Sequence, residues 1–176
     1  MASKIKVDQI QTADGTGTIA LQNQLSGMTT ASLPSTLLSS QMPTGSVLQV
    51  VNVSITADAS TTNSSYVDSG ISATITPTST SSKILMVTSF IVGGSSGASG
   101  YYQVKKNNSS VIWTSGRHYM SGDASVSPFT ILLLDSPSTT SATTYNFWYK
   151  SGSGTIYYHT YGSGSDGNII LMEIAG

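Results

Sequence analysis

From residue 47 to its last residue, the chain is a succession of short segments in which apolar and polar side chains alternate. The segments comprise residues 47–55, 71–76, 83–92, 101–105, 111–114, 129–134, 144–150, 155–161 and 168–174. Clusters of Gly, Ser, Asn and Pro separate them, and no segment sustains the 3.6-residue period of an amphipathic helix. This pattern predicts an all-β fold, an antiparallel, jelly-roll-like β-sandwich.

Aromatic residues divide the chain into two parts. Every Phe, Trp and Tyr lies at or after Tyr66, and aromatic side chains supply much of the buried area of a β core. We therefore expect residues 1–45 to form an extended N-terminal arm and residues 46–176 to form the head. The arm can bury too little apolar surface to offset its ordering entropy by itself. We expect it to be ordered only against copies of itself or another protein.

Two of the expected strands are apolar on both faces. In residues 83–92, one face carries Ile84, Met86 and Phe90, and the other carries Leu85, Val87 and Ile91. Residues 129–134 show the same property. A strand of this kind is typical of a position between a core and a second buried surface. Since symmetric assemblies of identical chains are common, we expect a homo-oligomer.

Charged residues form only 9% of the chain, against about 25% in a typical soluble domain. So few charges suit a subunit that is surrounded by other subunits. A net charge of −1 gives no basic field for nucleic acid. No apolar stretch reaches the roughly 18 residues that suggest membrane insertion. The one adjacent basic pair, Lys105 and Lys106, is expected at a solvated strand end or turn.

The residues that carry chemistry are few and dispersed. His118, Asp123 and one of the many serines could be drawn as a triad, but no nucleophile elbow is present. The glycines of residues 162–167 match a dinucleotide-binding pattern, but a strand-like segment follows them instead of a helix. The aspartates stand singly beside turns, where they commonly cap backbone amides. We expect no enzyme activity, no cofactor and no metal site.

Glu173 is unusual because it lies in an apolar strand. Its carboxylate is expected either to reach solvent at the end of the sheet or to pair with a cation such as Arg117 or Lys150.

Aromatic side chains of two strands form the candidate receptor surface. Alternation places Tyr157, His159 and Tyr161 on one face of their strand. It also places Trp148 and Lys150 opposite a second set, formed by Tyr145, Phe147 and Tyr149. One of these two sets must be core, and the more polar set, which contains Trp148 and Lys150, could be exposed. Exposed aromatic rings beside polar groups suit carbohydrate. The alternative is a tyrosine-rich subunit interface.

Two groups of segments resemble fibre-like proteins of marine bacteriophages, including cyanophages. The first group is SKIKVDQI at residues 3–10 with ADGTGTIALQN at residues 13–23. The second is MPTGSVLQV at residues 42–50, ITPTSTSSKIL at residues 75–85 and the ending LMEI at residues 171–174. These segments carry no catalytic motif, and they cover about a third of the chain.

The resemblance implies a virion component, commonly a homotrimeric tail fibre. Its arm would dock to tail or capsid proteins, and we assign this contact to Ile5, Val7, Ile10, Ile19 and Leu21. The head would contact a glycan or protein of the host cell surface. Many fibres have long shafts, whereas this chain passes almost directly from arm to head. A capsid fibre or a decoration protein that binds no receptor therefore stays open.

Overall fold

The computed structural model describes residues 42–56, 58–121, 125–158 and 167–176. Contacts divide the chain into two units, Met1–Leu37 and Leu38–Gly176, and every described residue belongs to the second. Residues 1–41, which make up most of the expected arm and include its five docking residues, lie outside the described residues. Their role, and the expected boundary near residue 45, stay predictions.

The described part of the chain is built from strands alone. The strands are β1 (Val47–Ile55), β2 (Ala59–Thr61), β3 (Val67–Ile75), β4 (Lys83–Gly94), β5 (Ser99–Lys106), β6 (Ser110–Thr114), β7 (His118–Tyr119), β8 (Ser125–Asp135), β9 (Thr143–Ser153), β10 (Ile156–Tyr158) and β11 (Gly167–Ile174). Within these ranges there is no helix long and apolar enough to cross a membrane. The predicted all-β class is confirmed.

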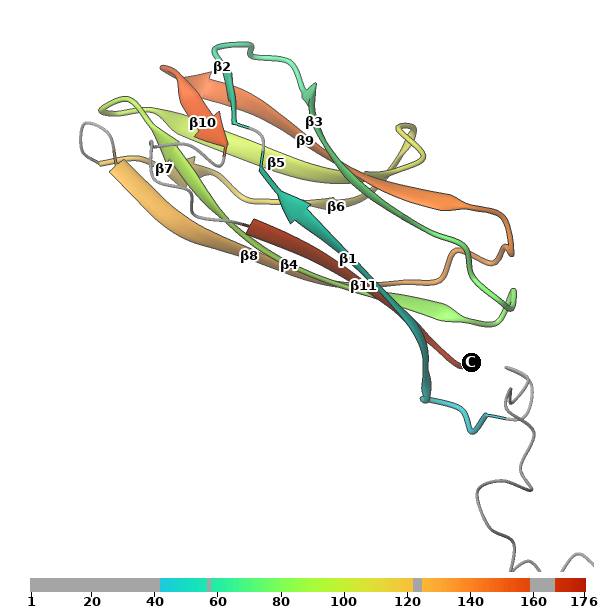
Figure 1. Ribbon diagram of the computed structural model, residues 1–176. Helices are drawn as coiled ribbons and strands as arrows, with labels where there is room; N and C mark the ends of the chain where they lie inside the picture. The colour runs from blue at the N-terminus through green and yellow to red at the C-terminus, as the bar shows by residue number, and fades with distance from the viewer. Residues whose placement is uncertain (1–41, 57, 122–124, 159–166) are drawn as a thin grey trace, which may run out of the picture. The chain divides into compact units, whose positions relative to one another are not determined.

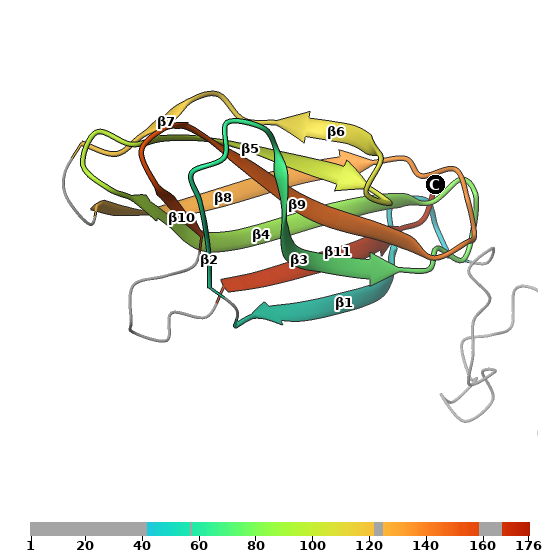
Figure 2. The ribbon, with the colours of Figure 1, turned by 90° about the horizontal axis from the view of Figure 1, so that it is seen from above.

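The strands form two antiparallel sheets that pack face to face (Figures 1 and 2). In the first sheet, β1, β11, β4 and β8 lie side by side. The short strand β10 pairs with the C-terminal end of β4, and β2 pairs with β10. In the second sheet, β3, β9 and β5 lie side by side, and both β6 and β7 pair with β5. Most successive long strands change sheet, which is the arrangement of a jelly roll. The expected jelly-roll-like sandwich is therefore confirmed.

Alternating side chains from both sheets fill the space between them. Of the two apolar faces of β4, the one that carries Ile84, Met86 and Phe90 points inward, and all three residues are buried. The second sheet contributes the inner set of β9, Tyr145, Phe147 and Tyr149, also buried. The rings of Phe90 and Phe147 meet edge to face across the core, with centroids 5.9 Å apart. Trp148 and Lys150 therefore lie on the outer face, as the more polar set was expected to.

The turn between β5 and β6 is the one that the adjacent asparagines predict. Asn107 and Asn108 have φ angles of 51° and 58°, in the left-handed region that asparagine tolerates better than most residues. Ser109 N donates to the carbonyl of Lys106 at 3.1 Å. Two successive left-handed residues form the tight hairpin turn whose twist matches antiparallel strands.

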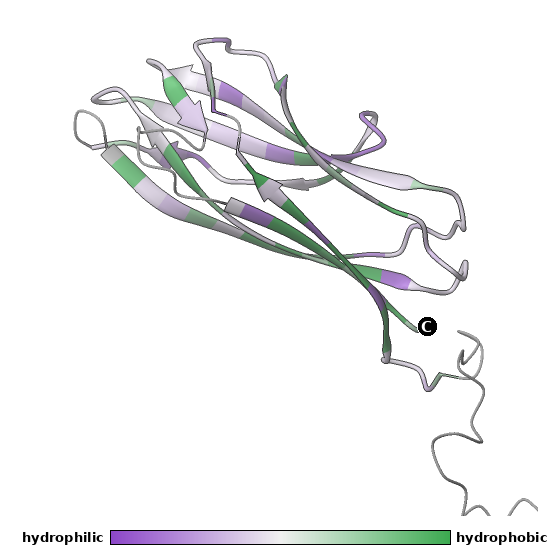
Figure 3. Ribbon diagram, viewed as in Figure 1, coloured by the Kyte–Doolittle hydropathy of each residue, from purple (hydrophilic) through white to green (hydrophobic). Residues whose placement is uncertain are grey.

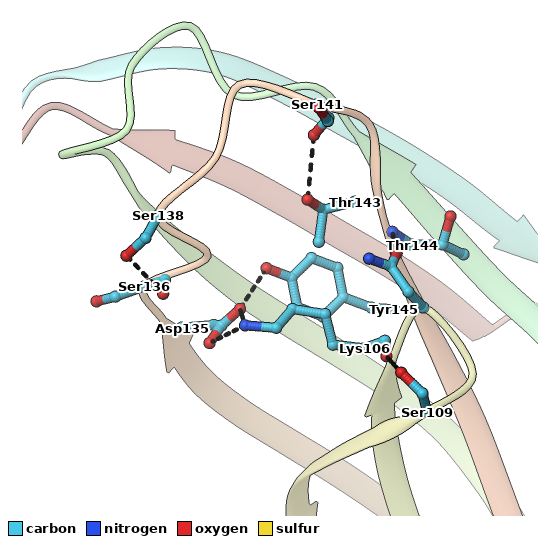
Figure 4. Close-up of polar contacts among 10 residues, drawn as sticks. Lys106, Ser109, Asp135, Ser136, Ser138, Ser141, Thr143, Thr144 and Tyr145 are labelled. Carbon is cyan, nitrogen blue, oxygen red and sulfur yellow. Dashed lines mark hydrogen bonds and ion pairs between the residues drawn. The ribbon is translucent and has the colours of Figure 1, made fainter.

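A polar cluster ties the two sheets together beside this turn (Figure 4). Lys106 of β5 donates to both carboxylate oxygens of Asp135, at 3.2 and 3.1 Å. The hydroxyl of Tyr145 donates to the same carboxylate at 2.9 Å, and burial with this bond raises the pKa of Tyr145 well above its usual value. Lys106 is thus an inter-sheet ion-pair partner, and the expectation of a solvated strand end is wrong for it.

Candidate functional site

Four neighbouring strands of the first sheet, β1, β11, β4 and β8, are rich in apolar residues (Figure 3), and one set of these side chains lies on the outer face of the sheet. One cross-strand row runs through Val50, Met172, Leu85 and Leu134, which pair in that order. The next row runs through Asn52, Ile170, Val87 and Leu132. We call the seven apolar residues of these two rows the apolar face. Neither row contains a charged residue.

A polar row borders the apolar face further along the strands. It runs through Ser54, Asn168, Ser89 and Thr130. The hydroxyl of Ser54 donates to Asn168 Oδ1 at 3.3 Å, and the hydroxyl of Thr130 donates to Ser89 Oγ at 3.4 Å. These side chains satisfy one another across the strands. The change from apolar to polar within one sheet face marks where a covering partner would end.

Strand β8 combines an exposed apolar surface with a free edge. Leu132 is 69% exposed and Leu134 is 55% exposed. Among the described strands, β8 pairs only with β4. A long apolar edge strand invites pairing with another chain, and natural proteins usually shorten, charge or cover such an edge. The structure therefore confirms that both faces of β4 and β8 are apolar, while the oligomer inferred from this pattern stays a prediction.

The outer face of the second sheet has a different chemistry, because cations lie against aromatic rings. Lys105 Nζ is 3.4 Å from the ring centroid of Trp148. Lys150 Nζ lies 4.9 Å from the ring of Tyr66 and 5.0 Å from that of Tyr101. We call these five residues the cation face. At the β7 edge of the same sheet, the Arg117 guanidinium is 5.5 Å from the ring of Tyr119.

A side-chain hydrogen bond and a closely packed glycine hold the cation face in place. The indole Nε1 of Trp148 donates to Asn108 Oδ1 in the β5–β6 turn at 3.3 Å. Gly152 allows Tyr101 to lie close to the backbone, since a Cβ at residue 152 would be 2.8 Å from the tyrosine ring. Burial, and the neighbouring Tyr101, raise the pKa of Tyr66, so its phenol stays protonated as a hydrogen-bond donor at neutral pH.

The predicted receptor residues do not form one surface. Trp148 belongs to the cation face on the second sheet, whereas Tyr157 lies on β10 in the first sheet. Tyr157 lines a shallow hollow together with Asp58, Ala59 and Ser60. His159 and Tyr161 lie outside the described residues. Sequence reasoning missed Tyr66, Tyr101 and Lys105 as neighbours of Trp148 and Lys150, because their pairing depends on which strands share a sheet.

The structure gives His118 a packing role. Its ring lies edge-on to Phe129, with centroids 5.7 Å apart, and 6.4 Å from the ring of Tyr102. Asp123, its possible triad partner, lies outside the described residues. In the described ranges, no group of three or more His, Asp or Glu side chains could hold a metal ion.

Glu173 differs from both expectations, because its carboxylate reaches neither solvent nor a cation. It is fully buried and accepts hydrogen bonds from Gln49 Nε2 at 2.6 Å and from Thr78 N and Oγ1 at 2.7 and 2.8 Å. Burial acts to raise the pKa of Glu173, but the hydrogen bonds from Gln49 and from the backbone and side chain of Thr78 outweigh it and hold the pKa below its usual value. The charge is therefore satisfied by neutral donors from β1 and from the segment between β3 and β4.

Comparison with known proteins gives no relative from which a role could be transferred: no family model matches the sequence, and no curated protein is similar to it.

Proposed function

We propose that this chain is a non-enzymatic structural subunit of a bacteriophage particle. Its arm docks to the virion, and its jelly-roll head assembles with identical heads into a homotrimeric tail fibre that faces the host cell. The observation that supports the assembly is the apolar face. The resemblance of the arm and of parts of the head to marine phage fibres supports the virion role. Jelly rolls also serve in viral capsid and lectin domains, although a fold alone does not define a function.

The apolar face suits another copy of this chain better than an unrelated partner. Its four strands are about 4.8 Å apart, so that the rows extend across about 14 Å. Two copies that meet through this face bring no like charges together, because neither row carries a charge. A partner with an ordinary charged surface would lose the hydration of its charges there without gaining ion pairs. Contact through this face also covers the surface of β8.

The absence of cysteine from the chain allows a direct test of the covered face. Leu132→Cys and Val111→Cys each introduce a single thiol, on the first and second sheet respectively. Leu132 is 69% exposed in one subunit and Val111 is 49% exposed, so the first thiol should react faster if nothing covers it. Our proposal predicts the reverse order: Leu132→Cys reacts at least about tenfold more slowly with a thiol reagent. Light scattering on the full chain should give the mass of a trimer.

Equal or faster reaction at Leu132→Cys, or a monomeric mass, would contradict the proposed assembly.

The place of the protein on the particle tests the virion role. Labelled antibody should bind at the tail, and particles that lack the protein should adsorb poorly to host cells. Labelling over the capsid, with normal adsorption of the deficient particles, would instead support the decoration protein.

A further inference from the structure

Positive charge in the head is concentrated on one side of the sandwich. The described residues contain five cations: Lys83, Lys105, Lys106, Arg117 and Lys150. Lys105 and Lys150 belong to the cation face, and Arg117 lies at the edge of the same sheet. Lys106 is bound to Asp135 between the sheets. The chain as a whole has a net charge of −1, so this surface has the opposite sign to the molecule.

These three cations have no counter-ion in the described part of the chain. The one salt bridge there joins Lys106 to Asp135. Asp68 is the acidic residue closest in register to the cation face, since it pairs with Trp148, and its Oδ1 accepts a bond from Gly70 N at 2.9 Å. The charge of the cation face is thus stabilised by aromatic rings, which leaves the ammonium groups able to bind an anion.

The geometry of the cation face favours an extended ligand. Trp148 and Lys150 are two residues apart on β9, so their sites follow each other at about 7 Å along the strand. The rings provide flat apolar surface, and the phenols of Tyr66 and Tyr101 with the amide of Gln103 on the same face provide neutral hydrogen-bonding groups. Rings with neutral polar groups suit sugars, and ammonium groups held at fixed positions suit carboxylates.

We propose that the cation face binds an acidic polysaccharide, whose carboxylates contact Lys105 and Lys150 and whose sugar rings lie against Tyr66, Tyr101 and Trp148. This inference rests on the proposed function for its biological setting, in which the head faces a bacterial envelope. Nucleic acid is less suitable, because its affinity grows with the number of phosphates neutralised and this face offers few cations.

The experiment is affinity electrophoresis of the full chain in gels that contain alginate, a polymer of uronic acids. Neutral dextran and a single-stranded oligonucleotide are the comparison ligands. We expect alginate alone to retard the protein, and less so as salt is raised. The double variant Lys105→Gln/Lys150→Gln should bind alginate about tenfold more weakly. Lys83→Gln, which makes the same change on the first sheet, should bind normally, and unchanged melting temperatures should show that both variants fold.

Three results would overturn the inference: no retardation by alginate beyond that by dextran, equal weakening by Lys83→Gln, or stronger binding of the oligonucleotide. The outcome is independent of the assembly tests. A trimer that ignores alginate would contradict the glycan site alone, whereas a monomer that binds alginate would contradict the proposed assembly alone.

Discussion

At the scale of single residues, Glu173 shows how an apolar strand can carry a charge. Gln49 is its cross-strand neighbour on β1, and Thr78 approaches from the segment after β3. A buried carboxylate is tolerated when several donors favour its ionised form, and here they lower its pKa despite burial. The carboxylate therefore joins the C-terminal strand to two other segments, which is a structural role.

Glu173→Gln should destabilise the fold in a pH-dependent way. Because the folded-state pKa lies below the usual value of 4.5, the ionised group stabilises the fold above that pH. This stabilisation is lost as the pH falls through the folded-state pKa. We expect the free energy of unfolding of the variant to fall by about 2 kcal/mol at pH 7. The amide NH2 of the new glutamine would face the donors that now bind the carboxylate. Urea unfolding should show that the loss shrinks below pH 4.5. A loss that is the same at pH 3 and pH 7 would contradict this account.

At the scale of elements, the β3 strand contains an irregularity that depends on a glycine. The register between β3 and β9 shifts between Asp68 and Ser72, and Gly70 lies there with a φ of 75°. A Cβ at residue 70 would meet no atom within 4 Å. Only the backbone conformation, and no packing contact, therefore favours glycine at this position.

Gly70→Ala should destabilise the fold by about 1 kcal/mol, because an L-residue is strained in the left-handed region. Gly116→Ala is the matched control. Its Cβ would also lie in open space, and Gly116 has no left-handed φ. The control should change stability little, or raise it slightly by restricting the unfolded chain. Chemical unfolding of both variants measures the difference, and an equal effect of the two substitutions would mean that the bulge conformation does not matter.

Local patterns predicted the elements better than the surfaces. Alternation placed β1 at its observed bounds and chose the buried side of β9, because both depend on neighbours in the sequence. Strands β2 and β7, of three and two residues, are too short to show a period. The pairing of Lys150 with Tyr66, the donors around Glu173 and the separation of Trp148 from Tyr157 all depend on sheet membership. Sheet membership is set by contacts between distant segments.

At the scale of the whole head, the two outer faces belong to opposite sheets of the sandwich. The apolar face lies on the outer side of β1, β11, β4 and β8, and the cation face on the outer side of β9 and β5, which belong to the two layers seen in Figure 1. An assembly that buries the first leaves the second toward solvent. The same fold can therefore hold identical subunits together on one side and present a ligand surface on the other.

Assembly through the apolar face should make the stability of the head depend on protein concentration. Subunits that associate only when folded stabilise the folded state by mass action, so the melting temperature of the full chain should rise with concentration. Leu132→Lys places a charge in this face and should weaken the dependence, because association would bury an unpaired ammonium. Val111→Lys makes the same change on the second sheet and should leave the concentration dependence of the melting temperature unchanged. Scanning calorimetry over a hundredfold range of concentration measures the three slopes, and a slope that Leu132→Lys leaves unchanged would place the contact between subunits elsewhere on the chain.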